Sequence, residues 1–210
     1  MSGLVTDAAA VTAAYAMGSV PVGLIVVRAV RGLDVREVGS GSMGSTNVLR
    51  AVGPAAAGAT LALDVGKGVG AVLVARRLGT GSGAQVAAAL AAAAGHSWPA
   101  GSGFRGGKSV ATACGALMVI APALSGFAIA AGVSALAVTR VVSVGSLTAA
   151  ATATLGAGLI AARGGPRGPL VYATLASTLI VARHGDNLRR LARGAEPRVS
   201  FSRPRSRPAR

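Results

Sequence analysis

The sequence has little charge, few acidic residues and few aromatic residues. Only 13% of its 210 residues are charged, six are Asp or Glu, and 3% are aromatic. A soluble domain carries about twice that charged fraction, so the composition excludes an ordinary water-soluble fold. The formal net charge is +15, but so few aromatic side chains leave no platform on which bases stack, and no nucleic-acid partner is expected.

Cysteine and histidine are equally scarce. Cys114 is the only cysteine, which excludes an intramolecular disulfide, and its apolar neighbours in the sequence are typical of a small packing residue. Two separated histidines and one cysteine provide no cluster of metal ligands. No metal site and no cofactor are therefore predicted.

Long apolar runs, in contrast, occupy most of the chain. Hydrophobic residues make up 52% of it, and about twenty consecutive apolar residues span a bilayer. The runs predict an all-α, polytopic membrane protein with seven transmembrane helices, in which Pro122 separates the fourth span from the fifth. We place the spans at 8–30, 54–76, 83–97, 109–121, 123–138, 145–163 and 168–183. Asp7 precedes the first run where a signal peptide would have a basic segment, so this run is predicted to be a span.

The distribution of basic residues predicts the orientation. With the N-terminus outside, the connections 31–53, 98–108 and 139–144 and the C-terminal end face the cytoplasm and hold most of the 21 Lys and Arg residues. The outer side keeps four of them: Arg76, Arg77, Arg163 and Arg167. Residues 1–196 then form a single membrane domain, and residues 197–210 form a basic, disordered cytoplasmic tail that faces anionic lipid.

The first inner connection, "VGSGSMGSTNVLR" at 38–50, has the composition of an anion-binding turn. Its glycines permit a turn in which backbone N–H groups converge. Arg50 follows as a fixed cation suited to bidentate contact with a phosphate. The alternative interpretation is a flexible Gly/Ser linker.

The second inner connection contains "GSGFRGGKSV" at 101–110, which is similar to a nucleotide-binding P-loop but departs from its pattern. That pattern requires a glycine where Ser102 stands and a strand before it, whereas apolar runs of helical length flank this segment. Gly106 and Gly107 still permit close approach of the backbone, and Lys108 supplies a positive charge at the start of a helix, whose free N–H groups attract anions. We expect this segment to bind a phosphate without a nucleotide-binding fold.

Two pairs of polar residues lie at helical spacing. Asp64 and Lys67 are three apart in the second span, where they are either a structural ion pair or a device that orients other polar groups. His184 and Asn187, also three apart, share a helical face just after the last span. Their position beside the two inner connections makes them candidates for the same site.

Taken in order, several segments resemble the bacterial membrane-integral acyl-phosphate:glycerol-3-phosphate acyltransferases, the PlsY-type family. The likeness covers about residues 15–196 and runs through "GSVPVGLI", "GSGSMGSTNVLR", "LDVGKG", "GH" with "FRGGKSVAT", "TRVVSVGS" and "RHGDNLRRLARGAE". Two positions depart from the family pattern. Ser42 replaces an asparagine, and Ser109 replaces a glycine at a point where close backbone approach or a positive φ is expected.

The resemblance implies an enzyme of the bacterial inner membrane with its active site at the cytoplasmic face, and a monomer is compatible with it. It implies transfer of a fatty acyl group from acyl phosphate to the 1-hydroxyl of glycerol 3-phosphate, giving lysophosphatidic acid and phosphate. The residues implied to bind glycerol 3-phosphate are Ser40, Arg50, Lys108, Ser146, His184 and Asn187, of which the catalytic ones are Lys108, Ser146, His184 and Asn187. The implied contacts to the phosphate of the acyl donor are Gly41, Ser42, Gly44, Thr46, Asn47, Gly106 and Gly107. The residues expected to support these groups are Asp64, Lys67, His96 and Ser143.

The chemistry of such a reaction fits the residues. An acyl phosphate is an activated mixed anhydride, so alignment and cations on the departing phosphate suffice without a covalent nucleophile. Either His184 or a substrate phosphate oxygen takes the proton of the hydroxyl, and the lack of an evident carboxylate to orient His184 favours the substrate. The alternatives are a transporter of small anions or phosphate esters, which requires polar groups at the membrane midplane and an internal repeat, and a divergent acyltransferase paralogue.

Overall fold

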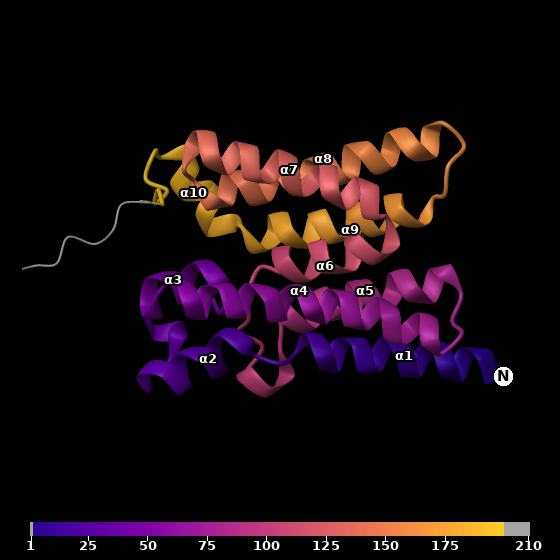
Figure 1. Cartoon of the computed structure of the whole chain (residues 1–210), viewed down its shortest axis with the longest axis horizontal. Coiled ribbons are helices and arrows are strands. Elements are labelled where there is room, and N and C mark those ends of the chain that lie inside the picture. The colour runs from indigo at the N-terminus through magenta and orange to yellow at the C-terminus, as the bar shows by residue number, and fades with distance from the viewer. Residues whose placement is uncertain (1, 200–210) are drawn as a thin grey trace, which may run out of the picture.

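The computed structural model describes residues 2–199, which form an elongated bundle of helices with the N-terminus at one end (Figure 1). No strand occurs within this range, and the predicted all-α fold is confirmed. The helices are α1 (Ser2–Gly18), α2 (Val22–Arg31), α3 (Ser45–Val52), α4 (Pro54–Arg77), α5 (Ser82–Ser97), α6 (Val110–Ile120), α7 (Pro122–Thr139), α8 (Val142–Ala162), α9 (Gly168–Arg183) and α10 (Gly185–Ala192), with 3-10 turns η1 (Val35–Glu37) and η2 (Ala100–Ser102). Of the predicted basic tail at 197–210, residues 200–210 lie outside the described residues.

Every predicted span coincides with helical structure. Four segments are long and apolar enough to cross a membrane: Gly3–Arg31, Pro54–Arg77, Pro122–Thr139 and Val142–Ala162. Helices α6 and α9 are apolar but shorter. The number of seven crossings and the outward N-terminus stay predictions.

The helix boundaries differ from the predicted ones at two places. The first predicted span, 8–30, is interrupted between α1 and α2, because Pro21 has no N–H to continue the helical ladder. The predicted connection 31–53 is not all loop, since it contains α3, whose Val48 is buried against Val27 and Val35. The break before Pro122 is confirmed, because α6 ends at Ile120 and α7 begins with this proline.

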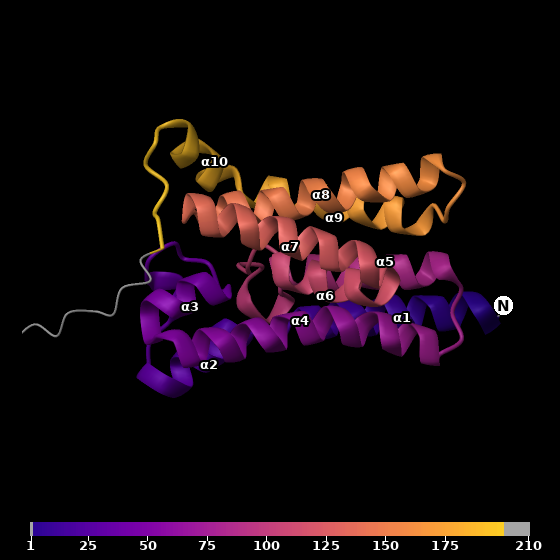
Figure 2. The same cartoon turned by 45° about the horizontal axis from the view of Figure 1, so that its top comes forward.

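Close packing of backbones holds the helices together. Helices α1–α5 form one side of the bundle, α7–α9 form the other, and α6 lies between them against α4 (Figures 1 and 2). A Cβ atom on Gly68 of α4 would lie 1.9 Å from the carbonyl oxygen of Thr112 in α6. Helices in lipid associate through such small residues, because apolar side chains gain nothing by leaving lipid for each other.

A buried ion pair fixes the break in the first span. Lys67 Nζ donates to the carbonyl oxygen of Val20 at 2.6 Å and to Asp64 Oδ1 at 2.8 Å. Asp64 Oδ1 also lies 3.5 Å from Nδ1 of His96, near the end of α5. Lys67 therefore gives a charged donor to a carbonyl beside the helix break, a group that is costly to leave unpaired in a membrane. Of the two roles open for Asp64 and Lys67, this geometry favours the structural one.

The ion pair makes a testable prediction about stability. Lys67→Met leaves the Asp64 carboxylate and the Val20 carbonyl without their ammonium donor, and we expect a loss of about 3–5 kcal/mol. The apparent melting temperature of the purified protein in detergent measures it. The double variant Asp64→Leu/Lys67→Met removes the unpaired charge and should recover part of that loss. An unchanged melting temperature in Lys67→Met would contradict a structural role.

Candidate active site

A polar pocket of about 260 Å³ lies where three distant parts of the chain meet. The first part precedes α3, the second precedes α6, and the third joins α9 to α10, at the end of the bundle opposite the N-terminus (Figure 1). The lining residues are Ser40, Gly41, Ser42, Gly106, Lys108, Ala182, Arg183, Gly185, Asp186 and Arg189. Three of the sequence motifs on the predicted inner side thus meet at one site.

Asn47 organises the first of these segments. Its Nδ2 donates to the carbonyl oxygens of Val35 (2.9 Å), Val38 (2.8 Å) and Ser42 (3.0 Å), and its Oδ1 accepts from the backbone N–H of Ser40 at 3.1 Å. The side chain is buried, with 1% of its surface exposed. Every one of these contacts is to the backbone of the turn. The geometry therefore assigns Asn47 to shaping the turn, although the sequence predicted a phosphate contact.

The two glycines of the second segment pack against His96. A Cβ atom on Gly107 would lie 2.1 Å from His96 Nε2, and one on Gly106 would lie 2.1 Å from the carbonyl oxygen of His96. The backbone N–H of Gly107 donates to that same carbonyl at 3.0 Å. This N–H is already used, so Gly107 contributes close packing to the site, while Gly106 lines the pocket itself.

Arg183 and Ser109 hold the same segment from its other sides. Arg183 Nε donates to the carbonyl oxygen of Gly107 at 3.1 Å, and its guanidinium lies 5.7 Å from the ring centroid of Trp98. Ser109 has φ = 61°, which confirms the positive φ expected where the family pattern has glycine. Its buried Oγ donates to the carbonyl oxygen of Ala93 at 2.5 Å and lies 2.7 Å from Ser97 Oγ. These two hydrogen bonds offset the strain of a left-handed serine.

Lys108 projects from this segment into a chain of hydrogen bonds. Its Nζ donates to Asn187 Oδ1, and Asn187 Nδ2 donates to Glu196 Oε1. Glu196 also accepts from Ser143 Oγ at 2.8 Å and from Arg190 Nε at 2.7 Å. Glu196 was not among the residues predicted from the sequence. Its one signal was a lone acidic residue in a basic C-terminal segment.

Burial lowers the pKa of Lys108 to about 8, although the nearby Glu196 carboxylate acts in the opposite direction. The positive charges of Arg190, Arg50 and Arg183 lower the pKa of Lys108 further. A phosphate in the pocket would supply the negative charge that this cluster lacks. The site is therefore electrostatically suited to an anion.

His184 is buried directly after α9. Its Nδ1 lies 2.8 Å from the carbonyl oxygen of Ile180, and since a carbonyl only accepts, Nδ1 carries the hydrogen. Burial lowers the pKa of His184, and the charge of Lys108 lowers it as well, so the ring is neutral with its lone pair on Nε2. A backbone carbonyl orients this ring, as expected from the lack of a suitable carboxylate in the sequence.

The remaining predicted residues lie away from the lining of this pocket. Arg50 is exposed on α3, and its charge acts on Lys108. Ser146 Oγ donates to the carbonyl oxygen of Val142 at 3.0 Å, and its side chain faces a small apolar cavity of about 30 Å³ between α6, α8 and α9. Gly44 caps the start of α3, and Thr46 lies in its first turn. Among the predicted residues, those that line the pocket are Ser40, Gly41, Ser42, Gly106 and Lys108.

The chain is similar to known proteins of a single family. A sequence model of the family described as glycerol-3-phosphate acyltransferase matches residues 8–194. The chain is 46% identical over 206 residues to the glycerol-3-phosphate acyltransferase of Anaeromyxobacter sp. (strain Fw109-5), with 95% of this chain and 99% of the relative covered. It is 43% identical over 193 residues to that of Symbiobacterium thermophilum, with 91% and 94% covered.

Solved structures are similar as well. The glycerol 3-phosphate form of PlsY (YgiH), an integral membrane glycerol 3-phosphate acyltransferase, has a TM-score of 0.86 and 34% identity, with 92% of this chain and 96% of that chain covered. Its lysophosphatidic acid form has a TM-score of 0.83 and 33% identity, with 92% and 95% covered. The likeness extends over nearly the whole bundle, and the family model at residues 8–194 includes all three segments of the pocket.

The packing of the second segment makes a prediction with a matched control. Gly107→Ala forces His96 away from its place beside Asp64, and overpacking of this kind costs about 1–3 kcal/mol. Gly101→Ala places its Cβ where nothing lies within 4 Å and should leave the melting temperature unchanged. Thermal unfolding of the two variants in the same detergent compares them. Equal melting temperatures would show that His96 does not restrict residue 107.

Proposed function

This chain belongs to the glycerol-3-phosphate acyltransferase family, an integral membrane family, and we propose that it transfers a fatty acyl group from an acyl phosphate to the 1-hydroxyl of glycerol 3-phosphate. The products are lysophosphatidic acid and inorganic phosphate. The observation that carries this proposal is the meeting of three segments and their cations around one polar pocket. Both proposed substrates carry a phosphate, and a cluster of arginines around a partly buried lysine suits such a group.

The choice of donor follows from the hydroxyl and thiol groups near the pocket. Ser40 and Ser42 line it and have no His, Asp or Glu among their hydrogen-bond partners within residues 2–199. Ser143 donates to Glu196 but does not line the pocket. Cys114 lies within α6 and faces the small apolar cavity, and Ser146 donates its hydroxyl hydrogen to the carbonyl of Val142. Within residues 2–199, neither side chain is hydrogen-bonded to a His, Asp or Glu that could act as its base. An acyl phosphate does not require one, because its phosphate is already a good leaving group that cations stabilise as it departs.

Lys108 is the proposed centre of the site. Its ammonium stabilises the negative charge of a phosphate, and Asn187 holds it in place through the hydrogen bond to Glu196. The residues proposed to surround glycerol 3-phosphate are Ser40, Arg50, Lys108, Ser146, His184 and Asn187. The acyl phosphate would be held by the turn at 40–42 and by Gly106. Arg50 has no hydrogen bond or ion pair within residues 2–199, which leaves its fork free for a ligand.

We assign the proton of the attacking hydroxyl to a phosphate oxygen of the substrate. The neutral His184 has a lone pair on Nε2, but its Nδ1 hydrogen is bonded to a carbonyl and not to a carboxylate. Burial lowers the pKa of His184 more than the charge of Glu196 raises it, so formation of an imidazolium is disfavoured. His184 then acts as a hydrogen-bond partner of the substrate. In this mechanism the protein aligns the two substrates and supplies the positive charge, and a phosphate oxygen of the substrate accepts the proton.

The active site is proposed to face the cytoplasm, at the end of the bundle that carries α3 and α10, with the N-terminus outside and seven crossings in the inner membrane. Most of the basic residues lie at this end, which supports that orientation. A transporter would need polar groups lining the midplane. The buried pair in the middle of α4 is instead satisfied by Val20 and by its own two members.

Phosphate release by the purified protein in lipid tests the reaction. Palmitoyl phosphate and glycerol 3-phosphate together should release phosphate and form lysophosphatidic acid in equal amounts, and either substrate alone should release none. Lys108→Ala should lower turnover by about a hundredfold or more, because a cation is lost from the leaving group. Transfer from palmitoyl-CoA but not from palmitoyl phosphate would overturn the proposed donor.

The pKa of Lys108 predicts the alkaline limit of activity. In the substrate-free protein, Lys108 carries its charge below about pH 8 and loses it as the pH rises through that value. The ratio kcat/KM should therefore fall above about pH 8. Lys108→Arg keeps the charge, and the decrease in its remaining activity should therefore occur at a higher pH. If the activity of Lys108→Arg decreases at the same pH as that of the wild type, the decrease reports the titration of another group.

A further inference from the structure

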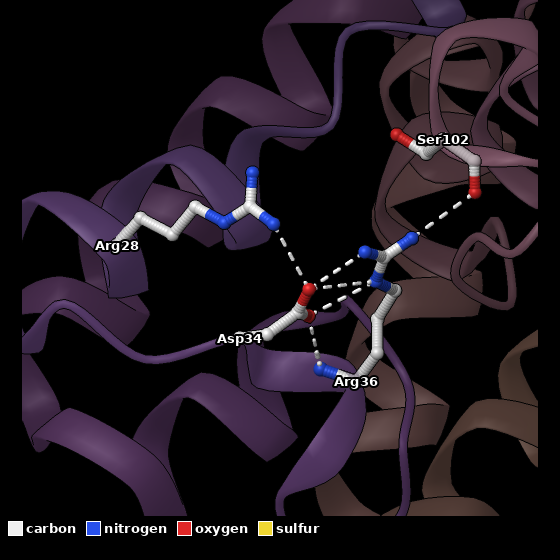
Figure 3. A network of polar contacts seen from close by, with 4 residues as sticks. All are labelled: Arg28, Asp34, Arg36 and Ser102. Carbon is white, nitrogen blue, oxygen red and sulfur yellow. Dashed lines mark hydrogen bonds and ion pairs between the residues drawn. The ribbon is translucent and has the colours of Figure 1, made fainter.

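A cluster of charges joins the first loop of the site to the second (Figure 3). Arg36 Nε lies 2.9 Å from Asp34 Oδ1 and its Nη2 lies 2.6 Å from Oδ2, while its Nη1 donates to the carbonyl oxygen of Ser102 at 3.2 Å. Asp34 also accepts from the backbone N–H of Arg36 at 3.0 Å, which fixes the start of η1. One guanidinium therefore binds a carboxylate on its own loop and a carbonyl of the other loop.

This contact is the single hydrogen bond between residues 32–44 and residues 98–108, both of which the structure describes in full. The first of these loops carries Ser40 and Ser42, and the second carries Gly106 and Lys108, all of which line the pocket. Arg36 itself does not line it. The guanidinium thus fixes the position of one wall of the pocket relative to the other, from outside the pocket.

We propose that Arg36 is a positioning residue that holds the two phosphate-binding loops at the spacing the acyl-phosphate headgroup requires, an inference that rests on the proposed function. Arginine suits this task because its planar fork presents several donors in fixed directions, which a lysine does not. Asp34 keeps the fork in place. Its bidentate contact orients the guanidinium so that Nη1 faces Ser102.

The clamp formed by Asp34 and Arg36 does not change with pH near neutrality. Arg36 holds the pKa of Asp34 well below its usual range, and Asp34 raises the pKa of Arg36. The groups that face this pair are Arg28, which also bonds Asp34, and Glu37, whose charge acts on Arg36. Both partners therefore stay charged near neutral pH, and the clamp acts through geometry.

Arg28 provides a matched control. It contacts the same carboxylate at 3.0 Å, but its side chain is 57% exposed, against 27% for Arg36, and it makes no hydrogen bond to the second loop. Arg28→Gln removes one charge next to Asp34 and leaves the contact between the loops in place. Any effect of Arg36→Gln beyond that of Arg28→Gln therefore measures the clamp.

The test is steady-state kinetics of the full chain in lipid with palmitoyl phosphate and glycerol 3-phosphate. We expect Arg36→Gln to raise KM for palmitoyl phosphate about tenfold, because a hydrogen bond from a charged group is lost, while kcat changes by less than about threefold. Arg28→Gln should match the wild type. Arg36→Lys should not restore KM, and Asp34→Asn with Arg36→Gln should be no worse than Arg36→Gln alone, since both act through one clamp.

Hydrogen–deuterium exchange of the peptide covering residues 98–109 provides a readout that does not depend on activity. Exchange in this peptide should be faster in Arg36→Gln than in Arg28→Gln and the wild type, with the rest of the bundle unchanged. Exchange equal to the wild type, or a KM that Arg36→Lys restores, would overturn the proposal, the latter by showing that the charge alone acts. A wild-type protein without acyl transfer would refute the proposed function, and the exchange experiment would still decide whether the clamp exists.

Discussion

The hydrogen bond from Lys67 to the carbonyl of Val20 supports the arrangement of the whole site. Pro21 breaks the first span, and an ammonium from α4 satisfies the carbonyl beside that break. Asp64 neutralises this ammonium and faces His96, and the ring and carbonyl of His96 seat the two glycines before Lys108. A charge buried in the bundle thus helps to fix the position of Lys108, the proposed catalytic lysine.

Several polar groups in and beside the two loops are used within the protein. The amide of Asn47, the N–H of Gly107 and the guanidinium of Arg183 all bond to backbone or receive bonds from it. What remains for a ligand is mainly positive charge, from Lys108 and Arg50, because Arg189 is already paired with Asp186. Under the proposed function, the site would therefore recognise phosphate by cations more than by a nest of free N–H groups, and charge already in place stabilises a departing phosphate with little reorganisation.

The sequence was sufficient for the helices and for the meeting of the three motif segments, because apolar runs and Gly/Ser-rich turns are local signals. It was not sufficient where a short polar segment folds against distant residues. Helix α3 is eight residues long and lies in a segment whose glycines and serines predict a turn, so only its packing on Val27 and Val35 makes it helical. Likewise Arg36 reaches a carbonyl 66 positions away, and no local pattern encodes that contact.

Glu196 shows why a site proposed to bind anions retains a carboxylate. Arg190, Arg50 and Arg183 together with burial would favour a neutral Lys108, and Glu196 opposes them. A direct ion pair between Glu196 and Lys108 would occupy the ammonium and compete with a phosphate. The amide of Asn187 lies between the two instead, accepting from Lys108 and donating to Glu196. The carboxylate thereby supports the charge of the lysine through a neutral group, and the ammonium keeps hydrogens available for the substrate.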